Sequence, residues 1–198
     1  MMGTPVGQPV EQHPWGFFLP ENTRLLMLGS FPPPRARWSM NFYYPNIQND
    51  MWRILGLIFY GDKDYFLETK KAFSEEKAKA FCREKGIGIG DTAMEIVRLK
   101  NNASDNFLRV VTPLDPVEVL ARIPACEAVV VTGQKAMDTL LAMLPPVAEP
   151  KVGSFSLFAL SGRIFRLYRM PSSSRAYPKP VEEKAAVYRQ MFEELHML

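Results

Sequence analysis

Residues 25–32 read Leu25-Leu26-Met27-Leu28-Gly29-Ser30-Phe31-Pro32, an apolar run that ends in a glycine and enters a proline-rich loop. The run predicts a buried strand. The loop continues into residues 43–52, which read Tyr43-Tyr44-Pro45-Asn46-Ile47-Gln48-Asn49-Asp50-Met51-Trp52. Loops that leave the carboxyl ends of strands in open α/β sheets are where ligands bind. This aromatic loop is therefore the first candidate site.

Strand and helix patterns alternate along the rest of the chain. Strands are expected over 25–28, 109–112, 128–132, 155–160 and 164–170, and helices over 49–60, 74–85, 91–98 and 133–144 and from residues 115 and 180 onward. Residues 1–22, rich in proline and glycine, predict an irregular arm. The order predicts one domain over 1–198, a three-layer α/β/α sandwich with a short, mainly parallel central sheet. The last two strands, joined by Ser161-Gly162, predict an antiparallel hairpin.

Length and composition limit the class of protein. The chain has 198 residues, 47% of them hydrophobic, which suits one folded domain. Its apolar runs are too short for a membrane span, and its start does not resemble a signal peptide. Cys82 and Cys126 predict reduced thiols in a cytoplasmic protein. Because His13 and His196 are far apart, these cysteines and histidines cannot by themselves build a four-ligand iron-sulfur or zinc site. No metal and no cofactor are expected.

The distribution of charge is more informative than the net charge of +3. Two segments, 23–49 and 151–180, contain no acid. Their basic residues are Arg24, Arg35, Arg37, Lys151, Arg163, Arg166, Arg169, Arg175 and Lys179. This pattern predicts two loops that face phosphates. The alternative is a chance partition of arginines onto exposed strand faces.

The two acid-free segments also carry motifs that resemble those of the uracil-DNA glycosylase superfamily, and most closely its hypoxanthine-DNA glycosylase branch. The first family motif is a strand, Gly-Ser-Phe-Pro, and then Tyr-Tyr-x-His-Pro-x-Asn-x-Phe-Trp. It is matched here by Gly29, Ser30, Phe31, Pro32, Tyr43, Tyr44, Asn49 and Trp52. Residues 170–176, Met-Pro-Ser-Ser-Ser-Arg-Ala, are similar to the second family loop, Leu-Pro-Ser-Thr-Ser-Pro-Ala. The turn at 129–136 is also similar to one in the superfamily.

The resemblance implies a monofunctional DNA glycosylase that removes a deaminated base, hypoxanthine or uracil, from DNA during base-excision repair. The partner would be DNA containing a damaged base, bound by a monomer. Asn49 would be catalytic, positioning water or holding the base. Gly29, Ser30, Phe31 and Tyr44 would bind the base, with Tyr44 stacking on it. The loop of Ser172, Ser173, Ser174 and Arg175 would bind DNA, and Arg175 or Tyr177 would fill the gap left by the flipped nucleotide.

Each of these residues also has a purely structural interpretation. Asn49 suits a helix cap, Tyr44 and Phe31 suit a core beside Trp52, and the serines suit a flexible loop. Trp52 itself is expected in the core. Asp91 and Asp105 are candidate bases, but caps or turn residues are the expected role for both. The Gly86–Gly90 run lacks the spacing of a dinucleotide-binding loop.

Departures from the family pattern define the alternatives. Many branches place Asp or Asn directly after the first glycine to activate water, whereas Ser30-Phe31-Pro32 contains neither, as in the hypoxanthine branch. The family histidine is replaced by Asn46, the following proline by Ile47, and the proline of the second loop by Arg175. These changes favour a second hypothesis, a catalytically degenerate nucleic-acid-binding protein of the same fold. A third is an α/β enzyme acting on a small molecule, which predicts no affinity for DNA.

Overall fold

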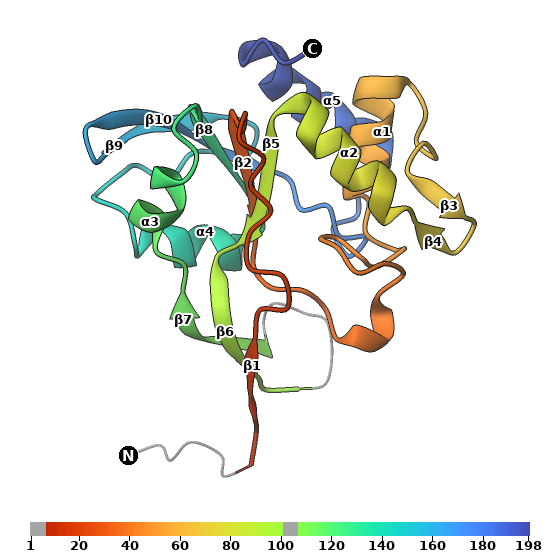
Figure 1. The fold of residues 1–198 in the computed structure, drawn as a ribbon, viewed down its shortest axis with the longest axis horizontal. Helices are drawn as coiled ribbons and strands as arrows, with labels where there is room; N and C mark the ends of the chain where they lie inside the picture. Colours follow the sequence, from red (N-terminus) through yellow and green to blue (C-terminus); the bar gives the residue numbers. More distant parts are fainter. Residues whose placement is uncertain (1–6, 101–106) are drawn as a thin grey trace.

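The computed structural model describes residues 7–100 and 107–198, and its centre is a sheet of five strands in the order β5-β2-β8-β10-β9 (Figure 1). Their bounds are β5 (Ile87–Asp91), β2 (Leu25–Gly29), β8 (Ala128–Thr132), β10 (Arg163–Met170) and β9 (Phe155–Leu160). The first four are parallel, and β9 pairs with β10 in antiparallel fashion at one edge. The mainly parallel sheet and the edge hairpin are thus confirmed.

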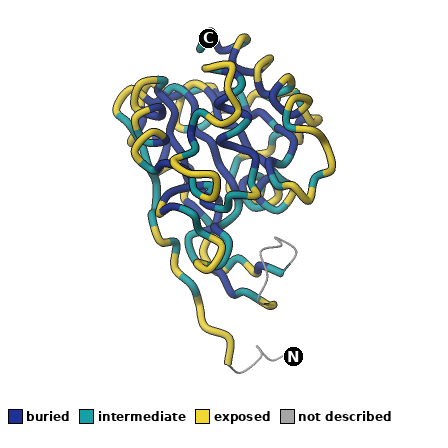
Figure 2. Tube along the Cα trace, turned by 90° about the vertical axis from the view of Figure 1, so that its right-hand side faces the viewer, coloured by how far each residue is buried: buried dark blue, intermediate teal, exposed yellow. Residues whose placement is uncertain are grey.

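Helices cover both faces of this sheet. Helices α1 (Met51–Tyr60), α2 (Glu75–Lys85) and α5 (Val181–Glu194) lie on one side, and α3 (Pro116–Ala121) and α4 (Gln134–Leu141) on the other (Figure 1). Successive residues of a strand point to opposite faces. Leu25 and Met27 therefore pack with the first group of helices, and Leu26 and Leu28 with the second. The sheet runs through the buried interior of the molecule (Figure 2), which confirms the three-layer sandwich.

Local signals set the helix boundaries. Ser74 caps α2 by accepting a hydrogen bond from the Lys77 backbone N–H at 3.2 Å. Asp115 caps α3 in the same way, accepting from the backbone N–H groups of Val117 and Glu118. Such caps satisfy the free N–H groups of the first turn. Helix α2 ends at Gly86, whose φ of 70° is readily adopted only by glycine.

The expected helix over 91–98 is wrong. Residues 93–98 form β6 (Ala93–Arg98), the middle strand of a second sheet between β1 (Val10–Gln12) and β7 (Leu108–Pro113). Both pairings are antiparallel. One partner of β6, β1, lies about 80 residues earlier in the chain, and the other, β7, follows after a loop, so periodicity within residues 91–98 did not reveal either pairing. Long-range pairing overrides a weak local helix signal.

The N-terminal segment is not irregular throughout. Besides forming β1, it bridges Phe18 to Ile89 through two backbone hydrogen bonds of 2.9 Å. The ring of Phe17 lies over Gly90, where a Cβ would come within 2.1 Å of it. The glycines of β5 thus let the segment pack closely against the edge of the sheet. The Gly86–Gly90 run therefore contains most of β5, which pairs with β2, and its glycines mark a close approach of the N-terminal segment.

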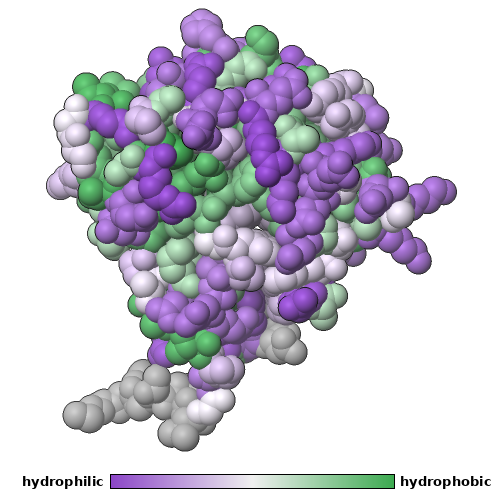
Figure 3. All heavy atoms as spheres, in the orientation of Figure 1, coloured by the Kyte–Doolittle hydropathy of each residue, from purple (hydrophilic) through white to green (hydrophobic). Residues whose placement is uncertain are grey.

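The remaining elements lie at the periphery. They are the short strands β3 (Leu67–Thr69) and β4 (Ala72–Phe73) and the 3-10 turn η1 (Arg35–Arg37). Hydrophilic side chains dominate the right of Figure 3, over α1 and α2, and more apolar ones lie on the left, towards β9 and α3. Within the described ranges, every helix is too short or too polar to cross a membrane.

Candidate active site

A pocket of about 580 Å³ opens where the parallel strands end. The last residues of β2, β5 and β8, which are Gly29, Asp91 and Thr132, all line it, together with Ser172 just after β10. Parallel strands bring their carboxyl ends to one edge of a sheet, which is where ligands bind in such folds. The volume lies within the range of about 300–1,000 Å³ that is usual for ligand sites.

The predicted site residues meet at this pocket. Its lining includes Gly29, Ser30, Phe31, Tyr44, Asn49, Ser172, Ser173, Ser174 and Arg175. They come from two loops more than 120 residues apart in the chain. Their convergence is a property of the fold, and the role of each residue is a separate question.

The two loops are joined directly. Asn49 and Ser174 form an isolated antiparallel bridge, and the Asp50 backbone N–H donates to the Ser173 carbonyl at 2.8 Å. The hydroxyls of Ser172 and Ser174 each accept a backbone N–H two residues further on, at 3.2 Å. Each hydroxyl can still donate its own hydrogen. The serine loop is therefore ordered by its own hydrogen bonds and by the first loop.

A buried ion pair holds this junction. Lys184 of α5 is 1% exposed, and its Nζ donates to Asp50 Oδ2 at 3.3 Å and to the Ser174 carbonyl at 3.0 Å. Arg175 Nε also reaches Asp50, at 3.3 Å. Lys184 was not among the residues predicted for the site. Its signal was a lysine on the buried face of α5, four residues before the buried Tyr188.

Asn49 combines a capping role with an available donor. Its Oδ1 accepts from the Met51 backbone N–H at 2.9 Å, at the start of α1. This bond orients the amide, so Nδ2 is the group left over. Nδ2 makes no hydrogen bond within residues 7–100 and 107–198. The capping interpretation of Asn49 is thus correct, and it leaves one donor at the pocket wall.

Tyr44 has an unusual backbone conformation. Its φ is 53°, in the left-handed region, where non-glycine residues cost on the order of 1–3 kcal/mol. The hydroxyl lies 3.6 Å from where a Cβ would stand on Gly29. Burial, and secondly the charge of Asp91, raise the pKa of Tyr44, so it stays protonated. Such outliers persist where surrounding structure holds them, frequently at functional sites.

The other aromatic residues divide between core and site. Trp52 is fully buried and donates from Nε1 to the Tyr43 carbonyl at 2.9 Å, as expected of a core residue. Phe31 is partly buried and lies edge-on to the ring of His13, with centroids 5.4 Å apart. Phe31 therefore belongs to both the pocket wall and the packing behind it.

Several arginines of the two acid-free segments are engaged within the fold, and the contact of these segments with phosphates stays a prediction. Arg163 donates to backbone carbonyls of Leu120, Ile123, Pro124 and Cys126, and so holds the turn before β8. Arg169 pairs with Glu149, and Arg24 with Glu127. These arginines are used within the fold. Arg37 and Arg175 are the basic residues of the two segments that line the pocket.

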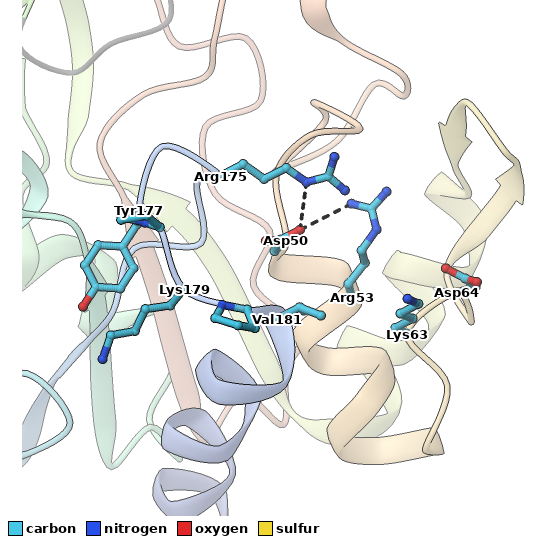
Figure 4. Close-up of a pocket in the computed structure, with 10 residues that line it drawn as sticks. Asp50, Arg53, Lys63, Asp64, Arg175, Tyr177, Lys179 and Val181 are labelled. Carbon is cyan, nitrogen blue, oxygen red and sulfur yellow. Dashed lines mark hydrogen bonds and ion pairs between the residues drawn. The ribbon is translucent and has the colours of Figure 1, made fainter.

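A second cleft of about 630 Å³ adjoins the first, with Arg175 in the wall of both. In Figure 4, Arg175 and Arg53 both reach towards Asp50, while Tyr177 and Lys179 approach from the loop before α5. Lys63 and Asp64 lie on the opposite side of the cleft. Burial and the nearby Arg175 lower the pKa of Arg53. The cleft thus places several cations next to the pocket.

Asp91 was expected to be a cap or turn residue, and this is wrong. It ends β5, lines the pocket, and accepts from His13 Nε2 at 2.6 Å. The signal available was an acid, Asp91, at the end of a parallel strand, next to the strand that ends in Gly29. Asp105, the other candidate base, lies outside the described residues.

Metal ligands do not cluster in the part of the chain that the structure describes, where no group of three His, Cys, Asp or Glu side chains could hold an ion. Cys82 and Cys126 are both unpaired and buried. Burial raises the pKa of Cys126 to about 11. Neither thiol lines the pocket.

Comparisons with known proteins locate the fold. No family model and no curated protein matches the chain. Among solved structures, it is similar to an NMR structure from Methanosarcina acetivorans that is provisionally described as a uracil DNA glycosylase. The identity is 23% and the TM-score 0.61, over 92% of this chain and 99% of the other. The chain therefore has the α/β/α fold of that protein.

Proposed function

We propose that this chain is a DNA glycosylase that hydrolyses the N-glycosidic bond of a deaminated base flipped out of DNA. The observation that supports it best is the joining of the two motif loops, through Asn49 and Ser174, at the carboxyl edge of the sheet. A flipped nucleotide needs a pocket of this size, a stacking surface and donors for its base and phosphates. The pocket offers a candidate for each.

The proposed roles follow from the contacts. Tyr44 would stack on the base, between walls formed by Gly29, Ser30 and Phe31. The base leaves with negative charge, and Asn49 Nδ2 is a donor already oriented by its cap, which can stabilise that charge. Because Asn49 Oδ1 is engaged with α1, holding the base is favoured over positioning water.

DNA would bind through the serine loop and the adjoining cleft. Ser172 and Ser174 can donate hydrogen bonds to phosphate oxygens, and Arg175 can add charge. Arg175 replaces a family proline, and the structure accommodates it through Asp50. The strand would then continue across Arg53 and Lys63 of the second cleft.

The substrate is proposed from the motif. Ser30-Phe31-Pro32 with Asn49 favours the hypoxanthine branch, with uracil as the second candidate base. The enzyme would need no metal or cofactor. A monomer acting in the cytoplasm stays a prediction.

A panel of oligonucleotides, each with one modified base, tests the proposal. Alkali cleavage after incubation should reveal an abasic site with hypoxanthine or uracil and none with undamaged DNA. Binding without release of any base would overturn the enzyme and favour the degenerate DNA-binding protein. No detectable binding at low salt would favour an enzyme acting on a small molecule.

A further inference from the structure

The pocket contains a carboxylate in the place where the first motif lacks one. Gly29 at the end of β2 and Asp91 at the end of β5 are paired in register, so their Cα atoms are neighbours. A Cβ on residue 29 would lie 2.8 Å from Asp91 Oδ1. The carboxylate therefore occupies the space beside Gly29, which a larger residue there would obstruct.

The two carboxylate oxygens of Asp91 have different surroundings. Oδ2 accepts from His13 Nε2 at 2.6 Å. Oδ1 receives no hydrogen bond from any residue that the structure describes, although Asp91 is only 6% exposed and lines the pocket. Among the described residues, the fully buried side-chain atoms without a partner are the Tyr44 hydroxyl and Thr92 Oγ1, so Asp91 Oδ1 is open to the pocket. A bound ligand or water can satisfy it.

His13 is held in one orientation. Its Nδ1 accepts from the backbone N–H groups of Trp15 at 3.1 Å and Gly16 at 2.9 Å. Two donors directed at Nδ1 place the hydrogen on Nε2, which donates to Asp91. The imidazole, with 3% of its side chain exposed, stacks on Tyr43 with centroids 5.6 Å apart. The ring cannot turn away without breaking these contacts.

We propose that Asp91 is a catalytic residue of this site, supplying from β5 the carboxylate that the first motif lacks, and that His13 is its positioning residue. This inference rests on the proposed glycosylase function. It also gives the N-terminal segment a part in the active site, because His13 directly follows β1.

In the proposed hydrolysis of the N-glycosidic bond, water is the nucleophile. The bond between C1′ and the base nitrogen breaks, and its electron pair leaves with the base. Water bonds to C1′, and its proton passes to Asp91 Oδ1 and then to solvent, while the departed base anion takes a proton from solvent. The negative carboxylate also stabilises the positive charge that develops on the sugar. His13 keeps Oδ2 engaged, so Oδ1 is the oxygen presented to the water.

Single-turnover excision tests both roles. General-base contributions are typically about 10²–10⁴-fold, so Asp91→Asn should slow excision at least about 100-fold with little loss of affinity for damaged DNA. Gly29→Ala should also slow excision, because its Cβ displaces Oδ1 while the carboxylate remains. Glu95→Gln is the matched control. It removes a carboxylate from β6 that bonds to Thr112 outside the pocket, and the rate should not change.

His13 requires a measurement that separates positioning from folding. In assays run well below the melting temperature of the variant, His13→Ala should lower the single-turnover rate. Its affinity for DNA should not change. His13→Gln, which can still donate to Asp91, should recover part of that rate. If His13 only fastens the N-terminal segment, both variants should lower Tm and leave the rate intact.

The outcomes distinguish this inference from the function it rests on. If the wild-type protein excises a base and Asp91→Asn does so at the same rate, the catalytic role of Asp91 is wrong and the glycosylase proposal stands. If the wild-type protein excises no base from any oligonucleotide, both proposals are overturned.

Discussion

Asn49 and Ser174 pair through their main chains in an antiparallel bridge, although 125 residues separate them. The bridge brings the helix start at Asn49 against the serine loop. Beneath it, Lys184 and Asp50 form a buried ion pair that contacts both loops. The pocket therefore has a rigid side, built by α1, α5 and the loop after β10.

Asn49 is expected to serve both the fold and the reaction. Asn49→Ala should cost about 1 kcal/mol of stability through the lost cap, and should lower single-turnover excision roughly 100-fold through the lost donor. Asn49→Asp keeps the capping acceptor but replaces the donor with a charge that repels an anionic base. It should be nearly as stable as wild type and as slow as Asn49→Ala. Urea unfolding and single-turnover rates check this, and an unchanged rate in Asn49→Ala would remove Asn49 from the mechanism.

Arg175 should contribute to binding rather than to catalysis. Its side chain is 53% exposed and its Nε is bound to Asp50, which leaves the terminal guanidinium nitrogens for a phosphate. Arg175→Ala should weaken DNA binding and reduce the slope of log K against log salt by about 1. Arg122→Ala, just after the end of α3 and similarly exposed, is the control and should leave the slope unchanged. Equal behaviour of the two variants in a fluorescence anisotropy titration would contradict the phosphate contact.

Tyr44 is expected to hold the base. Stacking is worth roughly 1–3 kcal/mol per base, so Tyr44→Ala should weaken binding to damaged DNA by about 5- to 150-fold and reduce excision. The ring is only partly buried, so the variant should remain folded. Tyr44→Phe keeps the ring and should bind as the wild type does. A large fall in Tm for Tyr44→Ala would show instead that the ring is mainly part of the core.

Lys184 should matter for stability. Removing one partner of a buried ion pair leaves an uncompensated charge, so Lys184→Met should destabilise the protein by about 3 kcal/mol. Arg175 and Arg53 stay near Asp50, which keeps the cost at the lower end of the usual range. Asp50→Asn combined with Lys184→Met should recover much of the loss. Lys179 is exposed in the loop just before α5, so Lys179→Met is the control. It should change the free energy of unfolding little in urea titrations.

The sequence by itself determined most of the central sheet. Leu25–Gly29 and Ala128–Thr132 are short apolar runs bounded by glycine, and such strands are buried on both faces of a parallel sheet. The helices beginning after Ser74 and Asp115 follow from caps within a few residues of the backbone groups that they satisfy. These signals are local, so they can be read without the fold. The motif residues around Gly29, Asn49 and Ser172 were identified in the same way.

Only the tertiary structure decided which groups share the pocket and which arginines do not. Arg163 looks the same in sequence whether it binds phosphate or backbone carbonyls, because the difference lies in neighbours some 40 residues away. The strand Ala93–Arg98 depends on partners on both sides of it. Asp91 and His13 are 78 residues apart, and their hydrogen bond exists because β1 and β5 place them together. Pairings of this kind are set by the free energy of the whole fold, to which local residue patterns contribute only a part.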